Sequence, residues 1–288
     1  MSDNRTTLSE APFGSVPREI FDRANVETKR FSTVLILDGD FVGSGTFIKW
    51  GDQHGILTAH HVVHNPYDSR RRFNFTSNQK LALQVEEDRD HWFDIDLCAC
   101  RCVDVGVPVS DEQGPDLSVI VFPSVGLGTP KAKKEFYDIS VNRQAKLEKS
   151  LLNTGAFVFA GCPQSKFEVL SGPTSGDQRL ISAHAGAFTL PDRRYEEAGF
   201  DFVELIVSYH SQSEALESFA GMSGGGVWRI PLFKHENEPV EKVRFKEVVL
   251  AGVVFYQTGI SEGRRRIRCH GGKSIFVNVL QALKNESG

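Results

Sequence analysis

The sequence has few of the features that mark a secreted or membrane-bound protein. It contains five cysteines among 288 residues, and an odd number cannot all pair in disulfides. No apolar stretch approaches the roughly 18 residues that cross a bilayer, and polar residues rather than an apolar signal segment follow Met1. We therefore expect a cytoplasmic protein that has no membrane partner.

An excess of charge of one sign is also missing. The chain carries 33 Lys and Arg against 37 Asp and Glu, a formal net charge of -4, which gives no general attraction to nucleic acid. Three short basic runs occur at residues 70–72, 131–134 and 264–268. We expect them to lie in solvated loops; a docking surface for an acidic partner is the alternative.

Methionine is scarce and phenylalanine is abundant, with 2 and 21 residues respectively. Aromatic and β-branched residues favour pleated surfaces, and many short apolar runs are separated by turn residues, which predicts an antiparallel barrel or sandwich. Strands are expected at residues 33–37, 45–50, 56–59, 81–85, 93–105, 117–122, 156–160, 203–207, 226–230 and 247–256. Helices are expected at residues 17–29 and 275–284, where apolar residues recur with helical spacing.

Three of the cysteines, Cys98, Cys100 and Cys102, alternate along the predicted strand at 93–105. Alternate residues of a strand share one face, so we expect a row of buried free thiols. A metal site is the alternative, but no further Cys or His has zinc-like spacing nearby, and we predict none.

Three segments contain residues suited to nucleophilic catalysis. Leu57–Val62 contains two histidines, Pro115–Ile120 an aspartate, and Gly221–Gly226 a serine between glycines. A serine hydroxyl is a weak nucleophile and needs a histidine base, which in turn needs a carboxylate to fix its tautomer. Glycines beside the serine let the backbone approach a substrate and direct N–H groups at a developing oxyanion.

These segments resemble the motifs of chymotrypsin-like serine proteases. Thr58–His61 is similar to the family's Thr-Ala-Ala-His, Asp116–Ile120 to its Asp-Ile-Ala-Leu-Leu segment, and Gly221–Gly225 to Gly-Asp-Ser-Gly-Gly. Gly43–Phe47 resembles the strand before the family's histidine. The chain order His, Asp, Ser is also that of the family, and the resemblance covers about residues 31–283.

The resemblance implies an all-β fold of two antiparallel six-stranded β-barrels, with a C-terminal helix. It places the first barrel at residues 31–124, a connection at 125–150, and the second barrel and the helix at 151–288. Residues 1–30 are expected to be an extension that is partly disordered and partly helical.

The resemblance also assigns roles to individual residues. It implies a serine endopeptidase in which His61, Asp116 and Ser223 are catalytic, and the N–H groups of Gly221 and Ser223 form the oxyanion hole. The partner is a protein or peptide substrate, and no cofactor is needed. The substrate-binding positions implied are Glu217, Phe255, Tyr256 and Gln257.

Other assignments remain open for the base and the acid. His60 is the alternative to His61, since neighbouring side chains point in different directions and only one of them can serve. The alternatives to Asp116 are Asp94, Asp96 and Asp104.

The serine motif also fits other structures. A nucleophile elbow of the α/β-hydrolase kind would need a helix after Ser223 and a later histidine, either His235 or His270. A structural glycine turn is the remaining alternative.

Two residues depart from the family pattern. Met222 stands where many secreted members have the acid that pairs with a new N-terminus after zymogen cleavage, so that switch is not expected here. Gly226 replaces a proline that is frequent in the family and is expected to loosen the loop. The alternative function is therefore a protease-like binding module, or a protease that is latent until an activating protein partner orders this loop.

Overall fold

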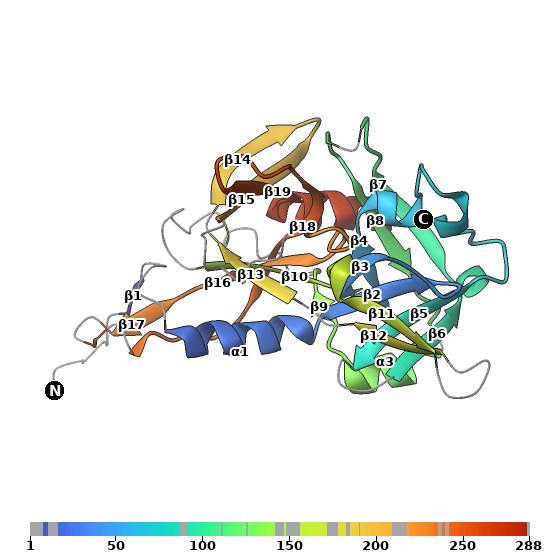
Figure 1. Ribbon diagram of the computed structural model, residues 1–288, viewed down its shortest axis with the longest axis horizontal. Coiled ribbons are helices and arrows are strands. Elements are labelled where there is room, and N and C mark those ends of the chain that lie inside the picture. The colour runs from blue at the N-terminus through green and yellow to red at the C-terminus, as the bar shows by residue number, and fades with distance from the viewer. Residues whose placement is uncertain are drawn as a thin grey trace.

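The computed structural model describes residues 8–10, 17–86, 91–110, 112–124, 126–141, 147, 156–171, 178–182, 185–189, 191–208, 218–235, 238–239 and 242–286. Two large sheets dominate these residues, the first formed by strands between residues 32 and 138 and the second by strands between residues 156 and 270 (Figure 1). All strand pairs but one are antiparallel; the exception joins the short strand β9 to β3.

The first sheet has the strand order β6-β5-β2-β3-β4-β8-β7, with β9 beside β3. The pairing of β4 with β8 runs from Gly55 against Val121 to Thr58 against Ser118, so the end of β4 lies beside the start of β8. The strands are β2 (Ser32–Leu37), β3 (Asp40–Trp50), β4 (Gln53–Thr58), β5 (Lys80–Glu86), β6 (His91–Asp96), β7 (Arg101–Gly106), β8 (Leu117–Val121) and β9 (Tyr137–Asp138).

The second sheet has the order β13-β10-β16-β18-β19-β15-β14. Its strands are β10 (Ala156–Gly161), β13 (Ala185–Thr189), β14 (Pro191–Glu197), β15 (Phe200–Ser208), β16 (Gly226–Ile230), β18 (Val249–Gln257) and β19 (Arg264–His270). Two small two-stranded sheets pair β1 (Leu8–Glu10) with β17 (Phe233–His235), and β11 (Phe167–Ser171) with β12 (Gln178–Ser182).

The predicted helices near both ends are present. Helix α1 (Arg18–Lys29) contacts β2 of the first sheet and β10 of the second, and buries Ala24 and Thr28. The C-terminal helix is a π-helical turn (Ser274–Val279) that continues into α5 (Leu280–Asn285), which contacts β7. Short helices are α2 (His60–Val63) and α3 (Gly128–Lys133), with 3-10 turns at Ser69–Arg71, Leu97–Ala99 and Gln164–Lys166. None of the helices in the described ranges has the length and apolar character needed to cross a membrane.

Aromatic rings join the two halves in the core. The ring of Trp228 on β16 is fully buried, stacks on Phe31 at 5.0 Å between centroids, and meets Tyr137 edge-on at 5.3 Å. Such pairs contribute about 0.5–1.5 kcal/mol each beyond the area they bury. The strands β2, β8 and β16 are buried along their whole length, which explains why their sequences are mostly apolar and do not alternate with polar residues.

Some expectations need correction. The predicted strand at 93–105 is two strands, β6 and β7, because a 3-10 turn at Leu97–Ala99 interrupts it. Cys98 is therefore exposed while Cys100 is buried, and the expected row of thiols on one face is wrong. The predicted strands also miss β1, β9, β11, β12, β13, β14, β17 and β19. Strand pairing establishes two antiparallel sheets, and closure of each into a six-stranded barrel stays a prediction.

Candidate active site

His61 and Asp116 form a doubly hydrogen-bonded pair. Oδ2 of Asp116 lies 2.5 Å from Nδ1 of His61, and Oδ1 accepts the backbone N–H of His61 at 2.9 Å. They meet because His61 follows the end of β4 in helix α2, and Asp116 precedes β8, which pairs with β4. The carboxylate thereby fixes both the position and the tautomer of the ring.

The carboxyl group of Asp116 is almost completely buried, with a relative exposure of 1%. Burial opposes its ionisation, but the hydrogen bonds and the charge of His61 outweigh burial and hold the pKa of Asp116 below its ordinary value. Asp116 is therefore a carboxylate at neutral pH, and Nδ1 of His61 is the donor in their hydrogen bond.

His270 supports Asp116 from the second sheet. The backbone N–H of Asp116 donates to Nε2 of His270 at 2.9 Å, and Nδ1 of His270 lies 3.4 Å from the hydroxyl of Ser274. Its ring is fully buried among Phe200, Phe202 and Phe255. Burial lowers the pKa of His270 to about 4, so the ring is neutral at pH 7 and accepts through Nε2.

The alternative residues occupy other environments. Asp104 lies 2.9 Å from Nε2 of His64 and 3.8 Å from Nε2 of His60. Asp96 pairs with Lys80, and Asp94 is exposed on β6. Among the candidate pairs, the structure brings Asp116 together with His61.

The loop that carries Ser223 is anchored by Ser44. The hydroxyl of Ser44 donates to the carbonyl of Gly221 at 2.8 Å and accepts the N–H of Cys162 at 2.9 Å. The N–H of Ser44 donates to the carbonyl of Ser223 at 3.0 Å. Ser44 belongs to the Gly43–Phe47 motif, so the role of this motif in the structure is to hold the serine loop.

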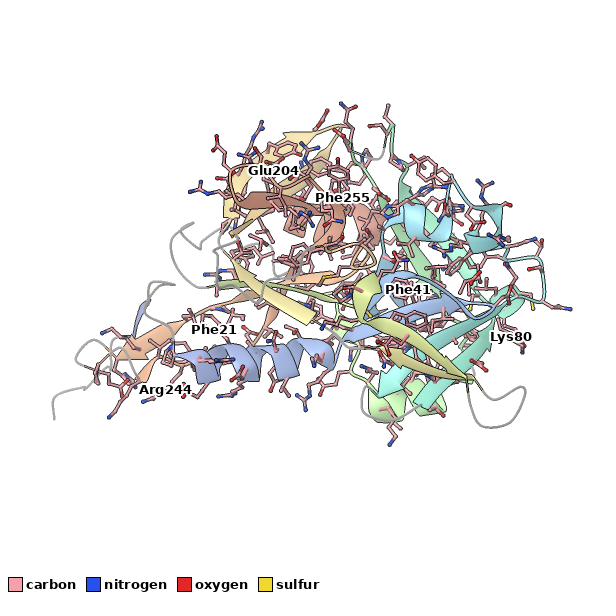
Figure 2. All side chains as sticks on the ribbon, viewed as in Figure 1. Phe21, Phe41, Lys80, Glu204, Arg244 and Phe255 are labelled. Carbon is pink, nitrogen blue, oxygen red and sulfur yellow. The ribbon has the colours of Figure 1, made fainter. Side chains whose placement is uncertain are left out.

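Two glycines of the loop adopt backbone angles that only glycine tolerates readily. Gly221 has φ +90° and Gly224 has φ +85°. A Cβ on Gly224 would lie 2.1 Å from both the carbonyl oxygen of Ser44 and the hydroxyl of Thr58. A Cβ on Gly221 would lie 2.6 Å from the ring of Phe41, the residue of β3 labelled in Figure 2. The glycines are thus needed for close packing as well as for the turn.

Backbone hydrogen bonds also orient the peptide groups of the loop. The carbonyl of Ala220 accepts the N–H of Gln164 at 2.7 Å, and that of Met222 accepts the N–H of Gly225 at 2.9 Å. In a planar trans peptide the N–H points opposite to the C=O, so the N–H groups of Gly221 and Ser223 point away from these partners. Neither N–H donates to an acceptor within the described part of the chain.

Met222 and Gly226 fit closely where they stand. The side chain of Met222 is fully buried in the larger hydrophobic cluster. Gly226 is the first residue of β16, and a Cβ there would lie 2.7 Å from Nε1 of Trp228. The strand β16 follows Ser223 directly, whereas a nucleophile elbow would continue into a helix. The elbow interpretation is therefore wrong, and Gly226 lies in a packed strand rather than in a loose loop.

A pocket of about 390 Å³ lies beside Ser223. Its lining includes the predicted residues Phe255, Tyr256 and Gln257; Phe255 is labelled in Figure 2. Gln257 connects strand β18 to the residues before Ser223, because its side chain accepts the N–H of Phe219 at 2.8 Å and donates to the hydroxyl of Ser218 at 3.1 Å. Glu217 lies outside the described residues. The remaining lining residues are His61, Asn65, Pro66, Tyr67, Phe219, Ala220, Gly221, Ser223 and Val254.

Several of these neighbours carry no local signal in the sequence. His270 and Ser44 were not expected to support the site, although Ser44 lies in a motif that the sequence does show. Asn65, Pro66 and Tyr67 follow the histidine helix and could have been suspected from that position alone. The sequence matches no protein-family model and no curated protein.

Proposed function

We propose that this chain is a serine endopeptidase, with Ser223 as nucleophile, His61 as general base and Asp116 as the group that orients His61. The observation that carries the proposal is that His61, hydrogen-bonded to the buried Asp116, lines the same pocket as the glycine-flanked Ser223. In this proposal each sheet closes into a chymotrypsin-like barrel, and the site lies in the cleft between them.

The proposed reaction follows from the donors and acceptors present. With Nδ1–H held by Asp116, the other ring nitrogen of His61 accepts the proton of Ser223 as its hydroxyl attacks the peptide carbonyl. The imidazolium formed is stabilised by the buried carboxylate and then protonates the leaving amine. Water, activated by the same nitrogen, hydrolyses the acyl-enzyme. None of these steps requires a metal ion or an organic cofactor.

The N–H groups of Gly221 and Ser223 are proposed to bind the oxyanion. Their lack of a described protein acceptor supports this role, because a preformed donor costs no reorganisation when charge develops. The anchoring of the loop by Ser44 and buried Met222 supports a loop that needs no zymogen cleavage to form. The same contacts favour an active enzyme over a binding module or a form latent until a partner binds.

The substrate is proposed to be an extended protein or peptide segment. The pairing of β16 with β18 ends at Gly226 against Val253, so residues 255–257 of β18 have β19 on one edge and no described strand on the other. An extended peptide can add to such an edge through backbone hydrogen bonds. Its side chain would then enter the pocket next to Ser223.

Hydrolysis of a peptide library by the purified chain tests the function. We expect cleavage by the wild type and a loss of turnover of roughly 10⁵–10⁶-fold for Ser223→Ala or His61→Ala. Ser140→Ala, an exposed serine that bonds to Asp138, is the matched control and should keep full activity. A loss below about tenfold in both site variants would show that other residues perform the reaction.

A further inference from the structure

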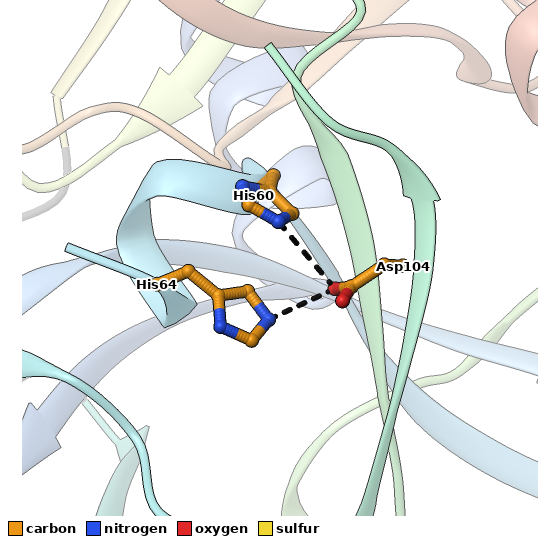
Figure 3. A group of neighbouring side chains, drawn as sticks. All are labelled: His60, His64 and Asp104. Atoms are coloured by element: carbon orange, nitrogen blue, oxygen red, sulfur yellow. Dashed lines mark hydrogen bonds and ion pairs between the residues drawn. The ribbon is translucent and has the colours of Figure 1, made fainter. Parts of the chain in front are cut away.

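A second group of polar side chains lies beside the His61–Asp116 pair and takes no part in it. His60 is the first residue of α2, His64 follows its last residue, and Asp104 faces them from β7 (Figure 3). Oδ1 of Asp104 lies 2.9 Å from Nε2 of His64 and 3.8 Å from Nε2 of His60. Each residue offers one ligand atom, and these three atoms all lie within 4.8 Å of one another.

The two imidazole rings lie against each other, and Nε2 of each is directed at Asp104. Their centroids are 4.4 Å apart with an interplanar angle of 28°, so the rings stack with similar orientation. The backbone N–H of His64 donates to the carbonyl of His60 at 2.9 Å, which places the two residues one helical turn apart. Many histidine pairs that chelate a metal have this spacing of four residues. Figure 3 shows both rings directed at the same carboxylate oxygen.

We propose that His60, His64 and Asp104 form a binding site for a divalent transition metal of the zinc type. Zinc lies about 2.0–2.2 Å from His nitrogen and carboxylate oxygen, which puts two tetrahedral ligands about 3.3–3.5 Å apart. The two distances to Asp104, 3.8 and 2.9 Å, bracket that value, and all three ligand atoms lie within 4.8 Å of one another, so side-chain rotations can bring both nitrogens and the oxygen to a common metal. Two imidazoles and one carboxylate suit zinc better than calcium or magnesium, which prefer oxygen ligands alone.

The carboxylate of this site has outer partners that hold it in place. The hydroxyl of Ser118 donates to Oδ1 of Asp104 at 2.9 Å, and the thiol of Cys102 lies 3.4 Å from the same oxygen. Partners of this kind orient the ligands of known metal sites. No local sequence pattern predicts the site, because Asp104 is far from the histidines along the chain and the β7–β8 pairing brings it near them.

Solvent reaches the cluster. A depression of about 600 Å³ is lined by His60, His61 and His64 together with the loop at 107–110. The side chains of His60, His64 and Asp104 are 12%, 31% and 40% exposed. A metal can therefore enter from solvent and keep a water molecule as its fourth ligand, which completes a tetrahedron.

The metal site is separate from the His61–Asp116 pair although the two share helix α2. Nδ1 of His61 is committed to Asp116, whereas His60 and His64 use Nε2 toward Asp104. The competing interpretation is that Asp104 only forms an ion pair with His64. Metal affinity of the three side chains distinguishes the two, because an ion pair alone needs neither His60 nor a metal.

Calorimetric titration of the full chain with ZnCl₂ tests the proposal. We expect one zinc ion per chain, and an affinity at least about 100-fold weaker in His60→Ala, His64→Ala and Asp104→Asn, since even outer-shell changes cost 10–100-fold. His61→Ala and His54→Ala remove histidines outside the cluster and should leave the affinity unchanged. Bound zinc should also raise the thermal midpoint of the wild type, by mass action on the folded state.

Circular dichroism of each variant establishes that it folds before its affinity is compared, and His64→Gln replaces any variant that does not. The proposal is overturned if the wild type binds no zinc at concentrations up to about 1 mM, the weak end of functional metal sites. It is equally overturned if the three cluster variants bind zinc as well as the wild type, or if His61→Ala alone abolishes binding.

Discussion

Nε2 of His270 accepts the backbone N–H of Asp116 at 2.9 Å and thereby ties the second sheet to the start of β8 in the first. The series of hydrogen bonds continues from Nδ1 of His270 to the hydroxyl of Ser274, which donates to the carboxylate of Asp201 at 2.8 Å. The position of Asp116, and through it that of His61, therefore depends on residues from the last strand and the C-terminal helix. His270 is fully buried, and we assign it the role of a positioning residue that acts through Asp116.

The buried neutral His270 makes stability depend on pH. Its folded pKa is about 4 and its unfolded value is 6.5, so the unfolded chain binds the extra proton first as pH falls. This contribution to the free energy of unfolding is fully present above pH 6.5 and is lost between pH 6.5 and about 4, by on the order of 3 kcal/mol. Urea unfolding of wild type and His270→Gln across this range measures it. The variant should lose less stability over this interval, and equal losses would contradict the assignment.

Replacing Asp116 by Asn tests the orientation of His61. The amide keeps the size of the side chain but presents a donor to Nδ1, which favours the wrong tautomer of the ring. We expect kcat to fall by about 10⁴-fold while the fold is retained. Asp96→Asn, which removes an exposed partner of Lys80, is the matched control and should change kcat little. Steady-state kinetics decide, and a fall of less than about tenfold would show that another acid orients the base.

Replacing Ser44 by Ala tests whether the serine loop is held from β3. The change removes both the donor to the Gly221 carbonyl and the hydroxyl that accepts the N–H of Cys162. We expect a loss of about 1–3 kcal/mol in the free energy of unfolding, and a fall in kcat that exceeds any change in KM. Ser140→Ala should do neither, since its hydrogen bond to Asp138 is exposed. Unchanged kcat in Ser44→Ala would mean that the loop holds its shape without this anchor.

Glu217 remains a prediction from its distance to Ser223 in the sequence. An acid at the base of the pocket would pair with a basic side chain of the substrate, so Glu217→Ala should weaken cleavage after Arg and Lys and spare cleavage after apolar residues. The cleavage profile of a peptide library reads this directly, with the exposed Glu19→Ala as control. An unchanged profile would remove Glu217 from the pocket.

The residues proposed to do the chemistry could be predicted from the sequence because each lies in a short motif at the end of a strand. Thr58–His61 and Asp116–Ile120 are local patterns, and antiparallel pairing of the strands they flank brings them together. The strands could be predicted where they are fully buried, as in β2, β8 and β16, since burial on both faces favours a short, mostly apolar sequence.

The surroundings of the site could not be predicted in the same way. His270 meets Asp116 only because β19 pairs with β18 and β15 in the second sheet, a relation with no local signal. The strand β14 was missed because its residues are mostly exposed and polar. The interruption at Leu97–Ala99 was missed because the apolar residues on both sides of it read as one strand.

The most direct test of Ser223 as the nucleophile is labelling of the folded chain by a fluorophosphonate, followed by mass spectrometry of its peptides. Such a probe reacts with a serine that a neighbouring base has activated. We predict one label per chain, on Ser223, which is absent from Ser223→Ala and strongly reduced in His61→Ala. A folded chain that stays unlabelled under all conditions, or a label on a different serine, would contradict the proposed function.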